Sequence, residues 1–257
     1  MTLPLEDLRA IAHRELAKVE GRPLFVTISG AHLYGFASPD SDFDVRGCHL
    51  MPLDAALSIA ARKETAEYTG IEGGREIDFV SHDAAKFFRL MLKKNGYVME
   101  QIFSPIVVVG GPDLDELRSI AGGCLTRHIH HHYRGFYQNQ MAMFEKEEVK
   151  KAKTLLYAYR VLLTGIHVLR SGEIEANLPR LLEAYPCPGV PELMAAKVKE
   201  KAGIGALDVE THRRALEGLS ARLEQGFSES KLPEEPREAA ALDRFLVTLR
   251  LRARGPS

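Results

Sequence analysis

The sequence has no tryptophan, only three cysteines and a formal net charge of only -1. Cys48, Cys124 and Cys187 have no Cys-x-x-Cys spacing, which argues against a disulfide framework and against a zinc knuckle. No segment reaches the roughly 18 apolar residues of a membrane span, and the first ten residues are too charged for a secretory leader. We therefore expect a cytoplasmic protein with no membrane partner.

The balanced charge and the few aromatic residues also limit the nucleic acids that the chain could bind. A chain with so little net charge has no general attraction to a phosphate backbone, so long duplexes are not expected ligands. With 7% aromatic residues there is no clear stacking platform for an extended single strand. The 257 residues are enough to bury one large core or two modest ones.

A strand, a glycine turn and an acidic segment follow one another near the N-terminus. The apolar residues 24–28 predict a buried strand that ends at Ser29 and Gly30, where backbone amides can face a phosphate. Residues 38–47 then read Ser-Pro-Asp-Ser-Asp-Phe-Asp-Val-Arg-Gly. If this segment is extended, Asp42 and Asp44 point to one face, where they repel each other unless a cation lies between them.

The acidic segment has two other interpretations. A calcium loop of the EF-hand type needs glycine at its sixth position and glutamate at its twelfth, where this chain has Val45 and Met51. An ordinary polar turn explains the glycine turn or the acidic segment when each is taken alone. The two motifs together, in this order, favour a catalytic site.

This order of motifs resembles the nucleotidyltransferases of the DNA polymerase β superfamily, over about residues 25–80. A bacterial and phage branch of predicted nucleotidyltransferases associated with RNA repair is similar over most of the chain. The resemblance implies that Asp42, Asp44 and a third carboxylate on a later strand are catalytic. These carboxylates would hold two Mg²⁺ ions, for which Mn²⁺ can substitute, on a nucleoside triphosphate.

The third carboxylate has two candidates on the strand expected at residues 75–81. Alternation puts Glu76 and Asp78 on one face and Ile77 and Phe79 on the other. We favour Asp78 because its apolar neighbours are those of a central strand, and Glu76 stays the competing ligand.

The resemblance also implies two groups of nucleotide contacts. The first group lies around the two motifs; it consists of Ser29, Gly30, Ala31, Ser41 and Arg46. The family's serine after the glycine is Ala31 here, so a phosphate contact is lost unless Ser29 or Ser41 supplies it. The second group lies on one face of a later helix, where a solvated charged stripe is an equally good interpretation; it consists of Lys150, Lys153 and Tyr157.

The hydrophobic pattern predicts an α+β fold, with a polymerase β-like mixed sheet and flanking helices followed by an all-α part. We place the boundary at Gly110-Gly111-Pro112, which gives a catalytic domain at 1–111 and a helical domain at 112–257. Strands are expected at 24–28, 45–50, 75–81 and 106–109, with hairpin fragments at 62–74. Helices are expected at 4–20, 53–61, between Asp83 and Asn95, and at 97–104, 113–121, 124–146, 149–171, 191–202, 207–226 and 235–253.

Two further segments carry unusual side chains. His128 and His132 share a helix face and could chelate zinc, but structural histidines are the more common interpretation. The C-terminal arginines, Arg250 among them, fit a solvated helix end better than a phosphate site.

The sequence thus implies a metal-dependent transfer of a nucleoside monophosphate from a nucleoside triphosphate to an acceptor hydroxyl. The acceptor could be an RNA end, a nucleotide, a small molecule or a protein side chain, and the sequence does not define the oligomeric state. The alternative is a module that senses nucleotide or regulates a partner without turnover, including an antitoxin-like nucleotidyltransferase. Intact aspartates favour the enzyme, and Ala31 favours the alternative.

Overall fold

The computed structural model describes residues 4–60, 62–198 and 208–253. The chain forms two compact units. Unit 1 consists of Met1–Leu33, Asp42–Cys124 and Glu235–Ser257, and unit 2 consists of Tyr34–Ser41 and Leu125–Glu234.

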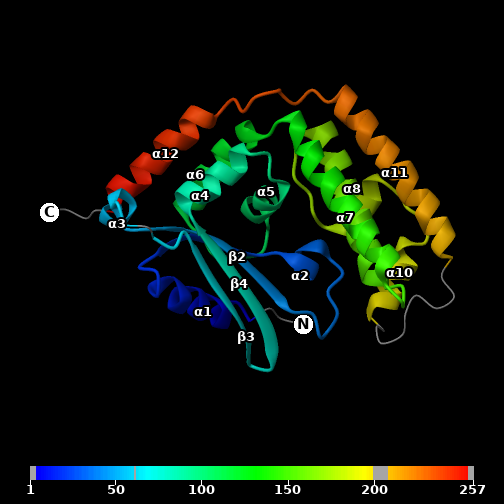
Figure 1. The fold of residues 1–257 in the computed structure, drawn as a ribbon, viewed down its shortest axis with the longest axis horizontal. Coiled ribbons are helices and arrows are strands. Elements are labelled where there is room, and N and C mark those ends of the chain that lie inside the picture. The colour runs from blue at the N-terminus through cyan, green and yellow to red at the C-terminus, as the bar shows by residue number, and fades with distance from the viewer. Residues whose placement is uncertain (1–3, 61, 199–207, 254–257) are drawn as a thin grey trace. The chain divides into compact units, whose positions relative to one another are not determined.

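Unit 1 contains a mixed sheet of five strands in the order β3-β4-β2-β1-β5. β2 and β4 are parallel neighbours, and the other pairs are antiparallel. The strands are β1 (Arg22–Ile28), β2 (Phe43–Leu50), β3 (Thr65–Glu72), β4 (Arg75–Asp83) and β5 (Val107–Val109). The helices of this unit are α1 (Leu5–Ala17), α2 (Gly30–Tyr34, whose last residue is counted in unit 2), α3 (Leu53–Leu57), α4 (Ala84–Leu92), α5 (Gly96–Phe103), α6 (Pro112–Ala121) with the 3₁₀ turn Gly122–Cys124, and α12 (Ala239–Arg252). Figure 1 shows the β3–β4 hairpin beside β2.

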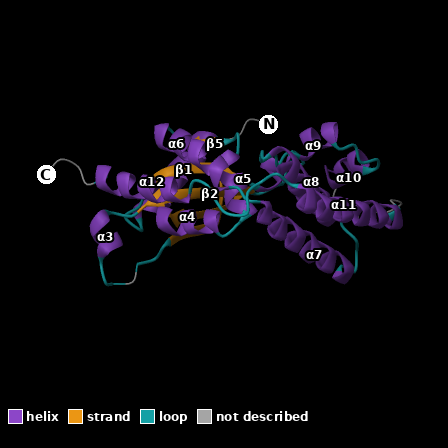
Figure 2. Cartoon of the chain, turned by 90° about the horizontal axis from the view of Figure 1, so that it is seen from above, coloured by secondary structure: helices purple, strands orange, loops and turns teal. Residues whose placement is uncertain are grey.

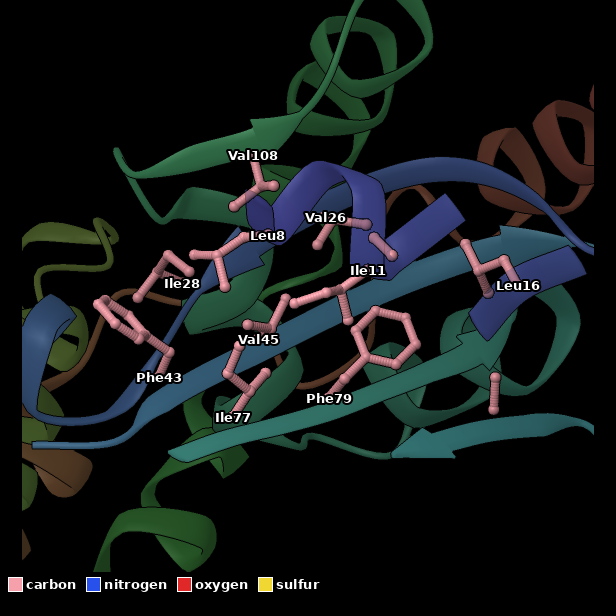
Figure 3. Packing of buried hydrophobic residues seen from close by; sticks show 12 residues of the cluster. Leu8, Ile11, Leu16, Val26, Ile28, Phe43, Val45, Ile77, Phe79 and Val108 are labelled. Atoms are coloured by element: carbon pink, nitrogen blue, oxygen red, sulfur yellow. The ribbon is translucent and has the colours of Figure 1, made fainter. Parts of the chain in front are cut away.

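The core of unit 1 lies between α1 and one face of the sheet. Leu8, Ile11 and Leu16 recur at helical spacing and are all at most 3% exposed. They pack on the alternate, inward-facing residues of β1, β2 and β4, as Figure 3 shows; these are Val26, Ile28, Phe43, Val45, Ile77 and Phe79. The residues between them on β2 and β4 therefore point to the opposite face of the sheet.

The opposite face of the sheet is covered in part by α4 and α5, which contact β1, β2 and β4. The Phe25 ring of β1 packs edge-on against Phe87 of α4, with ring centroids 5.4 Å apart. Asp83 caps α4 by accepting a hydrogen bond from Ala85 N, and Asn95 caps α5 in the same way through Tyr97 N. These caps fix where the two helices begin on the polar face.

Unit 2 is helical in the part that the structure describes (Figure 2). It contains the 3₁₀ turn Arg127–Ile129, α7 (His130–Lys146), α8 (Ala152–Ser171), α9 (Leu178–Ala184), α10 (Val190–Val198) and α11 (Val209–Glu229). α8 is its central element, because most of its residues are buried and it contacts α7, α9, α10 and α11. Among the described residues of both units, no helix is long and apolar enough to cross a membrane.

The fold class and most of the expected elements agree with the structure, but the division of the chain differs from a boundary at residues 111 and 112. α6 belongs to unit 1, where Arg118 donates to the carbonyls of Ile102 and Ser104. α12 also belongs to unit 1, where the Phe245 ring stacks on Phe88. The contact of α12 joins residues far apart in the chain, and the contacts of α6 reach back across Gly-Gly-Pro, so the composition change there does not mark a boundary.

Three smaller differences concern the helical elements. The structure forms α2 and α9, which the sequence pattern did not predict. The helix expected at 124–146 begins later, at His130, after two 3₁₀ turns. Residues 199–202 of the helix expected at 191–202 lie outside the described residues.

Candidate active site

The turn after β1 lies directly beside the strand that carries Asp44. Ser29 N donates to the Asp44 carbonyl at 2.8 Å, and Gly30 follows in the left-handed region with φ of +62°. A Cβ at Gly30 would lie 1.8 Å from Asp44 Oδ2, a distance that no side chain can tolerate. Glycine is therefore required here both for its backbone conformation and for the close approach of the carboxylate.

Asp44 and Asp78 are paired in register on the parallel strands β2 and β4. Their neighbours on each strand, among them Val45 and Phe79, face the core, so both carboxylates lie on the polar face of the sheet. Their side chains are 20% and 36% exposed, respectively. The structure thus brings together Asp44 and Asp78, the two carboxylates predicted from different strands.

A guanidinium group lies between these two carboxylates. Arg46 Nη2 is 2.8 Å from Asp44 Oδ1 and 2.6 Å from Asp78 Oδ2, and Arg46 Nε donates to the Tyr97 hydroxyl at 2.8 Å. Burial lowers the pKa of Arg46, but Tyr97 and Asp44 outweigh it, so the pKa lies above its ordinary value. Arg46 is therefore a cation that offsets the repulsion between Asp44 and Asp78, a different pair from the Asp42 and Asp44 between which the sequence predicted a cation.

Asp42 and Glu76 are not part of this ion-pair network. Asp42 precedes β2 and makes no hydrogen bond or ion pair to the described residues, although it shares unit 1 with Asp44. Glu76 is exposed, and its side chain likewise makes no such contact within the described part of the chain. Of the two candidates for the third carboxylate, only Asp78 is therefore joined to Asp44 through Arg46.

Ser29 and Ala31, two of the nucleotide contacts predicted at the turn, are both buried. Ser29 is fully buried, and its hydroxyl has no hydrogen-bond partner among the described residues. Ala31 is 3% exposed and carries no hydroxyl. The turn therefore offers backbone, and no exposed serine hydroxyl, next to Asp44.

Ser41 takes part in a network within unit 2 that the sequence did not indicate. Ser41 Oγ accepts from Ser38 N at 2.9 Å and lies 3.0 Å from Ser38 Oγ. Lys197 of α10 is 2% exposed, and its Nζ lies 3.1 Å from Ser38 Oγ and 3.4 Å from Ser41 Oγ. Lys197 thus holds the loop that precedes Asp42, a role that no local pattern around residue 197 could predict.

Of the contacts predicted on and just before α8, Lys150 and Tyr157 make structural interactions within unit 2. Lys150, just before α8, donates to the carbonyls of Phe144 and Glu145 at the end of α7. The Tyr157 ring packs edge-on against Tyr34, with ring centroids 5.6 Å apart. Lys153 is exposed. The assignment of Lys150, Lys153 and Tyr157 to nucleotide binding stays a prediction.

The histidine segment also forms contacts inside unit 2. His128 Nε2 lies 2.6 Å from Glu234 Oε2, and His130 stacks on Phe227 with ring centroids 4.6 Å apart. Burial lowers the pKa of His132 to about 4. In the described part of the chain, no three or more His, Cys, Asp or Glu side chains are grouped to hold a metal ion, which gives no support to a zinc site.

The chemistry of Asp44 and Asp78 nevertheless fits magnesium. Mg²⁺ prefers oxygen ligands and is usually held by one or two carboxylates together with substrate phosphates, so a third protein ligand is not required. Asp44 Oδ2 is directed to the backbone of Gly30 and is not used by Arg46. The carboxylates of the partly exposed Asp44 and Asp78 are therefore the kind of ligand that Mg²⁺ prefers.

A mixed sheet with flanking helices and a glycine turn beside Asp44 agrees with the polymerase β-like nucleotidyltransferase class that the sequence resembles. The profile of the RNA repair pathway DNA polymerase β family (RlaP) matches residues 4–248. The chain therefore belongs to this family.

Two other proteins are similar to the chain. The uncharacterized protein MJ0002 of Methanocaldococcus jannaschii is 31% identical over 226 residues, which cover 86% of this chain and 90% of that protein. A nucleotidyltransferase-like protein from Exiguobacterium sibiricum, known from a crystal structure, aligns over 98% of this chain and 81% of its own, with 12% identity and a TM-score of 0.34.

Proposed function

We propose that this protein transfers a nucleoside monophosphate from a nucleoside triphosphate to an acceptor hydroxyl. The acceptor oxygen forms a bond to the α-phosphorus, while the bond from that phosphorus to the bridging oxygen of the β-phosphate breaks. Pyrophosphate leaves with the electron pair, and the hydroxyl proton passes to a carboxylate or to water. The reaction needs no oxidant or reductant.

The observation that supports this proposal is the in-register pair of Asp44 and Asp78 on the polar face of the sheet, beside Gly30. Two bound Mg²⁺ ions would supply the positive charge that offsets the triphosphate and the departing pyrophosphate. Asp44 and Asp78 would hold these ions, with Asp42 as a further ligand. Asp78, the more exposed of the paired carboxylates, would accept the proton of the acceptor hydroxyl.

The composition of the chain and the description of its family both bear on the identity of the acceptor. The low charge and the few aromatic residues argue against an extended polynucleotide. The family description names an RNA repair pathway. A short RNA end is therefore the first acceptor to test, before small molecules and protein side chains.

The proposal is tested by titrating the four nucleoside triphosphates into the wild-type chain by calorimetry, first with Mg²⁺ and then with EDTA. We expect binding that requires Mg²⁺ and that is lost in the Asp42→Asn/Asp44→Asn double variant. Asp243→Asn, at an exposed position on α12, is the matched control and should bind as the wild type does. Absence of binding in every condition would contradict the proposal.

A second candidate function is nucleotide sensing or partner regulation without turnover, including an antitoxin-like role. Its support is the absence of an exposed hydroxyl at the turn, where Ala31 is buried and Ser29 is fully enclosed. Incubation with triphosphates labelled at the α-phosphate separates the two candidates. Magnesium-dependent binding together with label on an RNA end, or on the protein itself, favours the enzyme; the same binding with no label on any acceptor favours the sensor.

A further inference from the structure

The guanidinium of Arg46 is held from several directions at once. Its five N–H donors have acceptors in the structure. Nε donates to the Tyr97 hydroxyl, Nη1 donates to the carbonyls of Val45 and Asp78 at 3.1 and 2.5 Å, and Nη2 donates to Asp44 Oδ1 and Asp78 Oδ2. Arg46 therefore has no donor left over for an incoming phosphate.

Three of these five hydrogen bonds do not involve a carboxylate. Two go to backbone carbonyls of the central strands β2 and β4, and one goes to Tyr97 of α5. Arg46 is only 8% exposed, so moving it would leave these acceptors and its own charge without compensation in a buried place. The side chain is thus anchored independently of what the carboxylates bind.

The fixed positive charge of Arg46 affects how well Asp44 and Asp78 can bind a divalent cation. Asp42, Asp44 and Asp78 carry three negative charges, and Arg46 removes one of them from the local balance. A divalent cation at Asp44 and Asp78 would also lie close to a fixed positive charge, which repels it. The phosphates of a nucleotide supply the negative charge that offsets this repulsion.

We infer that Arg46 is an internal counter-cation that keeps the Asp44–Asp78 pair from holding a divalent metal ion by itself, so that metal binding at this pair depends on nucleotide. The inference rests on the proposed function. It assigns Arg46 to the control of metal affinity rather than to direct contact with phosphate. In the metal-free protein, Arg46 also fixes the distance between the two carboxylates.

The test measures Mn²⁺ binding to the full chain by electron paramagnetic resonance, without any triphosphate. We expect Arg46→Gln to bind Mn²⁺ about ten-fold more tightly than the wild type, because the repelling charge is gone while an amide can still donate to the strand carbonyls. Arg46→Lys keeps the charge and should bind as weakly as the wild type. Adding Asp44→Asn and Asp78→Asn to Arg46→Gln should abolish the gain, which places the ion at this pair.

A second set of measurements needs no variant. Mn²⁺ binding to the wild type should tighten at least ten-fold when a non-hydrolysable nucleoside triphosphate is present. Equal Mn²⁺ affinity with and without nucleotide, or no gain in a folded Arg46→Gln chain, would overturn the inference. The proposed function fails separately, if the wild type binds no triphosphate in the presence of Mg²⁺.

Discussion

The two ends of the β2–β4 strand pair carry similar residues in different surroundings. At one end, Asp78 pairs with Arg46 and remains 36% exposed. At the other end, Asp83 pairs with Arg250 at 2.8 Å and is only 2% exposed, and it also accepts hydrogen bonds from Met51 N and Ala85 N. Both ends contain an aspartate and an arginine, but only the Asp78 end leaves carboxylate oxygen accessible to a ligand.

The difference shows that an aspartate–arginine pair is not by itself a sign of function. At the Asp83 end the carboxylate caps α4, and Arg250 connects it to the C-terminal helix α12, so the pair joins elements of unit 1. The structure corrects the expectation that Arg250 lies on a solvated helix end, because its side chain is 13% exposed. Solvent exposure and the use of each oxygen separate the site from the structural pair.

The largest effect on stability is expected from Arg250→Met. Asp83 would keep its charge in a buried place with only two backbone donors, and breaking such a pair costs about 3–5 kcal/mol of unfolding free energy. Urea denaturation measures the loss. Arg252→Met is the control, because Arg252 is 59% exposed and lies at least 3.8 Å from its acidic neighbours, so its loss should cost under about 1 kcal/mol. Equal costs for the two variants would show that the buried pair has no special role.

A smaller effect is expected from pH at the same buried end, where His49 is paired in register with Asp83. Burial lowers the pKa of His49 from 6.5 to about 4 in the folded chain. The unfolded chain therefore takes up a proton that the folded chain does not, so stability is complete above pH 6.5 and falls as the pH drops toward 4. We expect His49 to account for about 1–3 kcal/mol of this loss.

The contribution of His49 is measured by comparing urea unfolding of the wild type and of His49→Asn across this pH range. Asparagine can retain the hydrogen bond that Nδ1 of His49 makes with Ser81 Oγ, but it does not titrate. The difference in stability between the two proteins should shrink as the pH falls. A difference that stays constant from pH 7 to pH 4 would mean that His49 titrates alike in the folded and unfolded chains.

The smallest stability effect is expected from Asp78→Asn, at the open end. The asparagine oxygen can still accept from Arg46 and the side chain is partly solvated, so the cost should be about 1 kcal/mol or less. Asp83→Asn is the matched variant at the buried end and should cost more. Magnesium-dependent triphosphate binding should show the reverse order, with the larger loss in Asp78→Asn. A large stability loss in Asp78→Asn would make its carboxylate structural rather than functional.

Much of the fold could be predicted because its signals are local. The helical spacing of Leu8, Ile11 and Leu16 predicts a helix where the structure has α1. The alternation around Asp78 predicts which side chains of β4 are buried and which are on the polar face. The division into units could not be predicted, because α12 joins β4 through the distant pair of Arg250 and Asp83, and α6 binds carbonyls of residues that precede Gly-Gly-Pro. Within unit 1 the aspartates were visible as a motif, whereas Tyr97 was not, and within unit 2 the contact of Lys197 with Ser38 and Ser41 was not visible either.

The sequence by itself determined most of the strands and helices and that Asp44 and Asp78 lie on the face of their strands opposite to the apolar residues, because side-chain alternation is a local property of extended chain. Only the tertiary structure decided that β2 and β4 run parallel with Asp44 opposite Asp78, and that Arg46 lies between them. Strand register and helix docking depend on contacts between distant parts of the chain. Docking of α12 also buries Asp83 against Arg250, whereas Asp78 stays partly exposed to solvent.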